Sequence, residues 1–384
     1  MPSTTQARVA GAVLALTLAA GALGISAVRA DPTPDLPPIA ADELLASSLR
    51  AMSSPPPVSG TVRTHVDLGL PSLPDISTGA ANGDAATAAS MLLGDQTFRL
   101  WRSPDGIRVS HLARFQEQVL VANHVEAWAW DSQSLSAVRL TPQDLTAAVP
   151  EGLARRVERS AASLPPSLGD PIRIARTLLE GVSPYAVASV ATPEVVAGRD
   201  AYTLRLRPRS EMTLVGAVDV AIDAETRLPL RLQVVPRNTI DPSIEVGFSA
   251  IDYGPIDPSI FAFHPPAEAS VTDAGPALAR VLSAAHVRRL AAMHGDPSKA
   301  DVKACRALLR QARSSPSPTM RVFGEGFGLI LAVRVSEVPA ELRSMLPYSG
   351  PLASAALVDR GQSGWIVAGA VTPDALSSVQ SKLP

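Results

Sequence analysis

The stretch VDVAIDAETRLPLRLQV, residues 218–234, decides the fold of this chain. Apolar residues occupy alternate positions on both sides of a short polar turn, Asp223–Thr226. Alternation with period two marks strands that bury one face and leave the other wet, and so short a connection joins two strands as a hairpin. The pattern therefore predicts neighbouring antiparallel strands.

The same alternation recurs along the chain, with turn residues such as Ser103–Gly106 and Gly198–Asp200 between the repeats. It predicts further strands at 62–68, 107–115, 202–206 and 244–248. A short helix is expected at 41–52, and a helical stretch at 141–184, with helix starts at Thr141–Pro142 and Asp170–Pro171. We expect a β-rich α+β fold in which a long meander is interrupted by helices.

Composition narrows the function classes. Of the 384 residues 46% are hydrophobic and 18% are charged, which suits a folded core. Lys and Arg number 34 against 36 Asp and Glu, so no basic excess indicates a nucleic-acid partner. The six histidines lack metal-ligand spacing, and the lone Cys305 cannot form a disulfide framework. We therefore predict no metal and no cofactor.

No catalytic motif is present either. The stretch Gly361–Trp365 lacks the final glycine of a nucleophile elbow, and Gly324–Gly328 lacks the Lys-Ser/Thr of a phosphate loop, so a turn is the better interpretation of the latter. Acidic residues are scattered singly along strand faces, as on a solvated surface. The sequence predicts a protein that is not an enzyme.

The first thirty residues have the pattern of an export signal. Arg8 precedes an apolar run to Val28, and Val28-Arg29-Ala30 forms a small-x-small site. Residues 1–30 are predicted to be an export signal cleaved after Ala30, with an uncleaved membrane anchor as the alternative. Residues 31–40 are Pro-rich and predict an extended tether. The protein is expected to be extracytoplasmic, in the cell envelope at the outer face of the cytoplasmic membrane or secreted.

Trp128 and Trp130 are two apart and so share one face of a strand. With Phe98, Phe115 and Phe248 they could line an apolar cavity. Ordinary core packing beneath the helices explains them equally simply, and on the residues alone we favour that interpretation.

The C-terminal part, 276–384, has a different pattern. Helices are predicted at 276–293 and 298–313, and strands at 327–336 and 365–371, before a last short helix capped by Thr372–Pro373. This part forms either a small second domain or an extension of the first sheet. Its basic residues, on a solvated helical face or a binding surface, are Arg280, Arg288, Arg289, Lys299, Lys303, Arg306, Arg310 and Arg313.

Several stretches together resemble the actinobacterial branch of the LolA-like superfamily. They are WAWD (128–131), TPQDL (141–145), GRDAYTLRLRP (198–208), VDVAIDAETRLPLRLQV (218–234) and EVGFSAIDYGPIDPSIFAFHPP (245–266). The C-terminal stretch that ends in GWIVAGAVTPDAL (364–376) is similar to the tails of the same branch. The resemblance covers about residues 40–270, and it rests on the order and spacing of the motifs rather than on any single one.

The resemblance implies an incomplete, half-open antiparallel β-barrel over 41–268, with helices closing its concave face and a smaller C-terminal α/β segment. It also implies an apolar space for acyl chains between sheet and helices, and hence an exported carrier of lipid or lipoprotein. Strand parity then predicts the lining as Phe98, Phe115, Trp128, Trp130, Leu178, Tyr202, Leu204, Val220, Leu232 and Phe248.

A second function stays open. RseB-like members of the superfamily are regulators that hold a membrane-bound anti-sigma factor with a LolA-like domain and a smaller C-terminal domain. The resemblance implies that the segment 276–384 would take the part of that smaller domain, so a membrane protein partner is the alternative to an acyl ligand.

Overall fold

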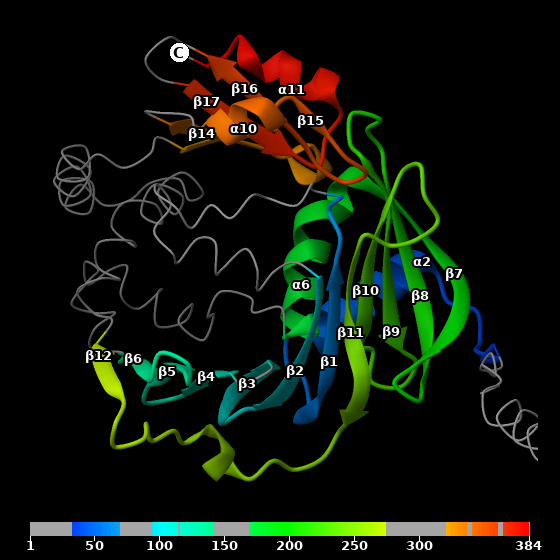
Figure 1. Ribbon diagram of the computed structural model, residues 1–384. Coiled ribbons are helices and arrows are strands. Elements are labelled where there is room, and N and C mark those ends of the chain that lie inside the picture. Colours follow the sequence, from blue (N-terminus) through cyan, green and yellow to red (C-terminus); the bar gives the residue numbers. More distant parts are fainter. Residues whose placement is uncertain are drawn as a thin grey trace, which may run out of the picture. The chain divides into compact units, whose positions relative to one another are not determined.

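The computed structural model describes residues 33–69, 94–113, 116–141, 169–273, 320–335, 340–359 and 364–383. The chain divides into two compact units, Met1–Thr33 and Pro34–Pro384, and the elements below all belong to the second (Figure 1). Residues 74–93 of the Gly-, Ala- and Thr-rich segment 74–95, residues 142–168 of the predicted helical stretch, the predicted helices at 276–293 and 298–313, the eight basic residues and Cys305 lie outside the described residues.

Twelve strands form one large sheet in the order β12-β6-β5-β4-β3-β2-β1-β11-β10-β9-β8-β7. All neighbours pair antiparallel except β12 and β6, which run parallel. The strands are β1 (Val58–Val66), β2 (Gly94–Ser103), β3 (Gly106–Ala113), β4 (Gln116–Asn123), β5 (Ala127–Asp131), β6 (Ser136–Leu140), β7 (Ala186–Val196), β8 (Arg199–Pro208), β9 (Val215–Asp223), β10 (Pro229–Pro236), β11 (Ile244–Asp252) and β12 (Ser270–Asp273). The two edges do not pair, so the predicted half-open, mostly antiparallel architecture is confirmed.

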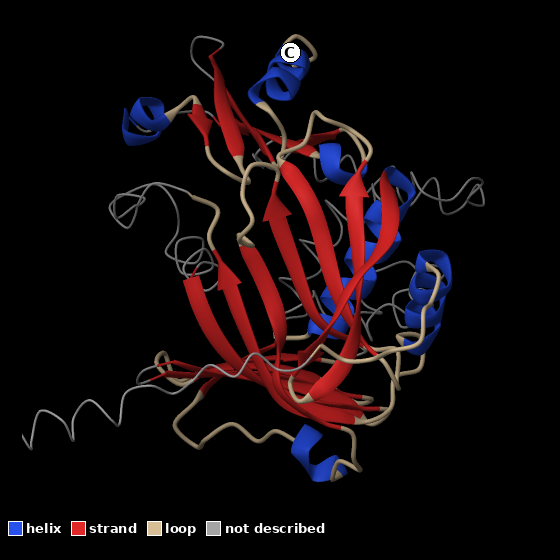
Figure 2. Ribbon diagram, turned by 90° about the vertical axis from the view of Figure 1, so that its right-hand side faces the viewer, coloured by secondary structure: helices blue, strands red, loops and turns tan. Residues whose placement is uncertain are grey.

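Two helices pack on one face of this sheet, which we call the inner face. Helix α2 (Ala41–Ala51) contacts β7 and β8, and α6 (Pro171–Val182) contacts β10 and β11 (Figure 2). Helix α6 begins where the sequence predicts: the carboxylate of Asp170 accepts a hydrogen bond from the backbone N–H of Arg173, and Pro171 occupies the first turn.

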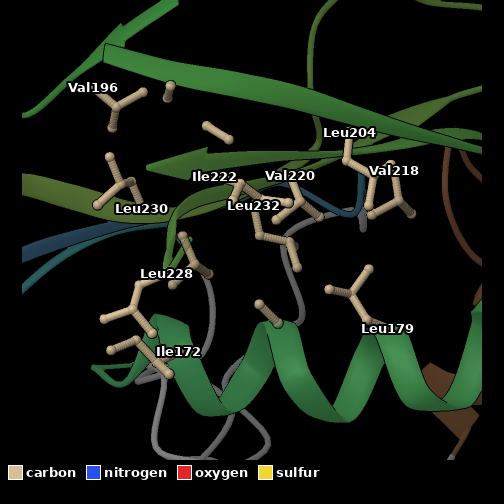
Figure 3. Packing of buried hydrophobic residues seen from close by; sticks show 14 of the residues in the cluster. Ile172, Leu179, Val196, Leu204, Val218, Val220, Ile222, Leu228, Leu230 and Leu232 are labelled. Atoms are coloured by element: carbon tan, nitrogen blue, oxygen red, sulfur yellow. The ribbon is translucent and has the colours of Figure 1, made fainter. Parts of the chain in front are cut away.

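The main core lies between the helices and the inner face. Ile172 and Leu179 of α6 point toward the apolar strand residues opposite, including Val220 and Leu232 (Figure 3). Each of these four side chains is almost entirely buried. Burying side chains of this size contributes about 1.5–3 kcal/mol each, so this layer holds α6 on the sheet.

Five further strands form a smaller sheet of their own, in the order β13-β14-β17-β16-β15. They are β13 (Met320–Phe323), β14 (Ile330–Val335), β15 (Tyr348–Ser349), β16 (Ser354–Asp359) and β17 (Gly364–Gly369), with helices α10 (Ala340–Met345) and α11 (Pro373–Gln380). Strand β14 starts three residues later than predicted, because Gly326–Gly328 form a 3-10 turn, η4.

The smaller sheet has its own core, in which α11 packs on β16 and β17. The predicted cap is present: the Thr372 hydroxyl accepts a hydrogen bond from the N–H of Ala375. Within the described residues one isolated bridge, Thr213–Val371, joins the β8–β9 connection to the second residue after β17. These strands therefore do not extend the large sheet, and the domain boundaries stay predictions.

Candidate functional site

The strand registers show on which face of the large sheet the predicted lining residues of the described strands lie. Leu204, Val220 and Leu232 lie directly opposite one another on β8, β9 and β10. Phe248 and Phe98 both lie opposite Val62 of β1, from its two sides. Residues opposite one another in a sheet point to the same side, and these side chains join the cluster that α2 and α6 bury. They therefore share the inner face.

Three further residues were predicted to line the cavity. Tyr202 lies in the same buried cluster, and its hydroxyl donates a hydrogen bond to the Pro37 carbonyl at 2.9 Å. Leu178 of α6 is partly buried against that cluster. Phe115 lies outside the described residues.

The two tryptophans lie on the opposite, outer face, which corrects the expectation that they line one space with Phe98. Trp130 pairs with Val119, whereas Phe98 pairs with His111 and His111 with Gln118. Neighbouring residues on β4 point to opposite faces, so Trp130 and Phe98 do as well. Alternation places Trp128 and Trp130 on one face of β5, but which face that is depends on the register of four strands, β5, β4, β3 and β2.

On the outer face the tryptophans form a separate aromatic cluster. The Phe263 ring lies 5.7 Å from Trp128 and 6.2 Å from Trp130, centroid to centroid. Phe261, in the 3-10 turn η2 (Pro258–Phe261), is buried in the same cluster, and the guanidinium of Arg139 lies over the Trp128 ring at 5.5 Å. The chain after β11 thus covers this part of the outer face.

The start of α6 is clamped to the inner face. The Arg102 guanidinium on β2 donates to the Asp170 carboxylate at 2.7 Å. Just before it, Gly169 lies so close that a Cβ atom there would meet Cγ1 of Val109 at 2.5 Å and Cβ of Phe98 at 3.0 Å. Only glycine allows this approach, so β2 and β3 fix where the helix begins.

Beyond this clamp one row of the inner face stays apolar but becomes exposed, beside a polar row that contains His111, Gln118 and Asp131. One row of directly opposed residues, the apolar row, crosses five strands; it consists of Leu100, Val109, Leu120, Ala129 and Val138. The first two are buried in the main core, whereas Leu120 is 38% exposed and Val138 is 40% exposed. An apolar surface continuous with the core therefore extends over β4, β5 and β6.

The outer face of the other half of the sheet is polar. Arg205 donates two hydrogen bonds to Asp219, at 2.7 and 2.6 Å, and Gln233 donates to Glu245 at 2.5 Å in the same cross-strand row. The bidentate, charge-assisted Arg205–Asp219 pair makes this part of the outer face polar and poorly suited to an apolar ligand. The inner face is thus the better candidate for apolar binding.

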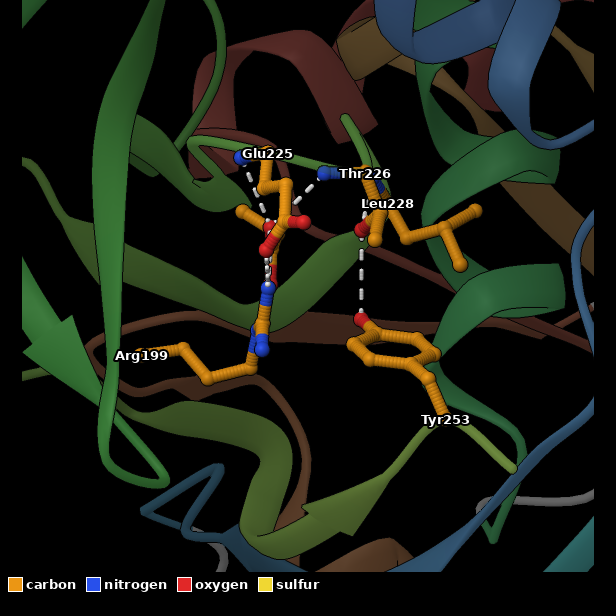
Figure 4. Close-up of polar contacts among 6 residues, drawn as sticks. Arg199, Glu225, Thr226, Leu228 and Tyr253 are labelled. Carbon is orange, nitrogen blue, oxygen red and sulfur yellow. Dashed lines mark hydrogen bonds and ion pairs between the residues drawn. The ribbon is translucent and has the colours of Figure 1, made fainter.

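The strongest polar cluster of the described residues lies at the start of β8 and the end of β9 (Figure 4). Arg199 donates to the fully buried Asp223 and, at 2.8 Å, to Glu225, and its guanidinium lies 4.9 Å from the centre of the Tyr253 ring. The Thr226 hydroxyl donates to the Tyr253 hydroxyl at 3.3 Å.

Two ionisation equilibria are shifted in this cluster. Burial alone would raise the pKa of Asp223, but hydrogen bonds from Arg199 and from the backbone N–H groups of Thr226 and Glu225 hold that pKa below its ordinary value. Burial raises the pKa of Tyr253 to about 12. At neutral pH Asp223 is ionised and engaged by its donors and Tyr253 is protonated, so the cluster stabilises the β9–β10 turn and offers no free base.

Two features that other functions would need are absent from the described residues. No three His, Cys, Asp or Glu side chains among them gather in a way that could hold a metal ion. Within the same ranges, no helix combines the length and the hydropathy needed to cross a membrane.

Comparison with known proteins gives matches of structure only: no family model matches the sequence, and no curated protein matches it. Similar solved structures include the Pseudomonas aeruginosa MucA/MucB complex, at 14% identity and a TM-score of 0.43, covering 88% of this chain and 96% of that chain. A LolA superfamily protein from Nitrosomonas europaea is 11% identical with a TM-score of 0.21, over 59% and 99% of the two chains.

A lipoprotein-sorting domain from Vibrio parahaemolyticus is 10% identical with a TM-score of 0.22, over 56% of this chain and 93% of that one. The structural neighbours thus include LolA-like proteins, as the sequence motifs predict. The actinobacterial branch stays a prediction.

Proposed function

We propose that this chain is an exported, non-enzymatic binding protein that holds acyl chains of a lipid or lipoprotein against the inner face of β3 to β6. The observation that supports this most is the apolar row, which continues the buried core out to Leu120 and Val138 on the side where α6 is clamped. The proposal includes export by residues 1–30 and an apolar ligand surface that extends from the predicted lining.

The energetics favour such a ligand. Five neighbouring strands span about 19 Å at a spacing of roughly 4.8 Å, so the row is long enough to lie along an extended acyl chain. Each methylene group moved out of water contributes about 0.8 kcal/mol, so one long chain provides useful affinity without any catalytic or ionic group.

A pair of valines tests the proposal. Val138 of β6 lies on the inner face, and Val271 of the neighbouring strand β12 lies opposite Ala137 on the outer face. Their exposures are similar, 40% and 50%. We expect Val138→Asp to weaken uptake of a fluorescent fatty acid at least about tenfold, since a charge would replace apolar contact. Val271→Asp should leave uptake unchanged, and equal effects of the two substitutions would contradict the proposal.

The smaller sheet supports a second function, regulation through a protein partner. Helix α11 covers one face of it, whereas Val322 and Leu331, which lie opposite each other, are exposed on the face that carries Ile366 and Leu357. In this alternative the segment from 276 to the C-terminus holds a membrane protein. A pull-down that Leu331→Asp abolishes, with fatty-acid uptake intact, would favour the regulator over the carrier.

A further inference from the structure

The edge strand β7 carries a segment without charged residues. Residues 186–192 read AVASVAT, without charge or proline, and Pro184 and Pro193 flank them. Among the described strands β7 pairs with β8 alone, and it forms the end of the large sheet (Figure 1). Proteins usually protect such edges with charge, proline or short strands, because unpaired backbone groups recruit another strand.

The other edge of the same sheet is protected. Strand β12 has four residues, runs parallel to its neighbour and ends in Asp273. By contrast β7 has 11 residues, and its irregular register lies between Ala191 and Glu194, beyond most of the uncharged segment. The contrast marks β7 as the edge of this sheet that is open to pairing.

The side chains along β7 fit an added strand on both faces. Ala188 and Val190 are partly buried against the main core, as are Leu45 and Leu49 of α2, the helix that packs on β7. Val187 lies on the outer face and is 51% exposed. An added strand would extend the apolar core on one side and cover Val187 on the other.

We propose that β7 pairs antiparallel with β7 of a second copy of this chain about a two-fold axis at Ser189. In that register Ala188 faces Val190 of the second copy, Val187 faces Ala191, and Ser189 faces itself. Each valine meets a small residue, and no like charges oppose one another within 186–192. A two-fold interface needs this self-complementarity, and an uncharged, size-alternating strand provides it.

Substitution of Ser189, the residue on the two-fold axis, tests the proposed dimer. Ser189 is exposed, so substituting it leaves the core intact. Ser189→Lys and Ser189→Asp each place two like charges opposite one another, and we expect each to raise the dimer dissociation constant about tenfold or more in sedimentation equilibrium. A mixture of the two variants should dimerise again, because Lys then faces Asp.

The matched control is Thr272→Lys, on the exposed edge strand β12, which should dimerise like the unsubstituted protein. A protein that is monomeric at all concentrations overturns the proposal, as does a dimer that survives both Ser189 variants. Restored association only in the Lys and Asp mixture identifies Ser189 as the centre of the interface. Since fatty-acid uptake is read separately, failure here leaves the carrier proposal standing.

Discussion

An ion pair between Arg102 and Asp170 joins strand β2 of the large sheet to the start of helix α6 on its inner face. Nη1 of Arg102 donates to Oδ2 of Asp170 at 2.7 Å, and the other oxygen of the same carboxylate caps α6 by accepting from the N–H of Arg173. Asp170 is buried, whereas Arg102 is partly exposed. One carboxylate thus starts the helix and ties it to β2, beside the point where the apolar row leaves the core.

Removing Arg102 should destabilise the fold. Arg102→Ala leaves a buried carboxylate without its charged partner, and we expect the free energy of unfolding to fall by about 2–4 kcal/mol. Urea denaturation measures this directly. The control is Glu180→Ala, which breaks only an exposed i,i+4 pair with Arg176 and should cost roughly 0.5 kcal/mol or less. Equal losses in the two variants would show that the Arg102 pair has no special role.

Asp223 predicts an acid-sensitive contribution to stability. Because its folded pKa lies below the unfolded value of about 3.9, the stabilisation is present above that pH and is lost as the pH falls through the folded pKa. Asp223→Asn should therefore be less stable than the parent by about 2–4 kcal/mol at pH 7, with the gap narrowing below pH ~4. Unfolding titrations at several pH values measure this, and a gap independent of pH would contradict the assignment.

Tyr253 predicts a contribution to stability that is lost at alkaline pH. Its folded pKa, about 12, lies above the unfolded value near 10, so its stabilisation is complete below pH ~10 and is lost as the pH rises toward 12. Tyr253→Phe keeps the ring beside Arg199 and should remove about 1–2 kcal/mol of the alkaline loss. The check is the slope of unfolding free energy between pH 9 and 12, and an unchanged slope would exclude Tyr253 as its source.

Disrupting the outer aromatic cluster should leave ligand binding intact. Phe263 contacts both Trp128 and Trp130, so Phe263→Ala should admit water and shift tryptophan emission to longer wavelength. Fatty-acid uptake should stay within about twofold of the parent, since these rings face away from the apolar row. A large loss of uptake would return the tryptophans to the ligand site.

Local signals in the sequence were enough for most elements of the large sheet. Alternation predicted β8, β9, β10 and β11, and Asp170–Pro171 predicted the start of α6. These features depend on residues near one another in the chain, where period two and capping chemistry act directly.

The predictions that failed concern which face of the sheet a residue occupies, and this depends on pairing between strands that are distant in the sequence. Alternation shows that Trp128 and Trp130 share a face, but only the registers linking β5 through β4 and β3 to β2 show that Phe98 lies on the other one. The exposed end of the apolar row was missed for the same reason: Leu120 and Val138 belong to strands with weak alternation. A shift of one residue would exchange the faces.

The most direct test of the carrier proposal is native mass spectrometry of the purified protein, followed by solvent extraction of whatever it holds. The account predicts one acyl lipid for each chain in the parent and in Val271→Asp, and much less in Val138→Asp. A parent protein that is empty, and that also takes up no fluorescent fatty acid when it is offered, would contradict the account.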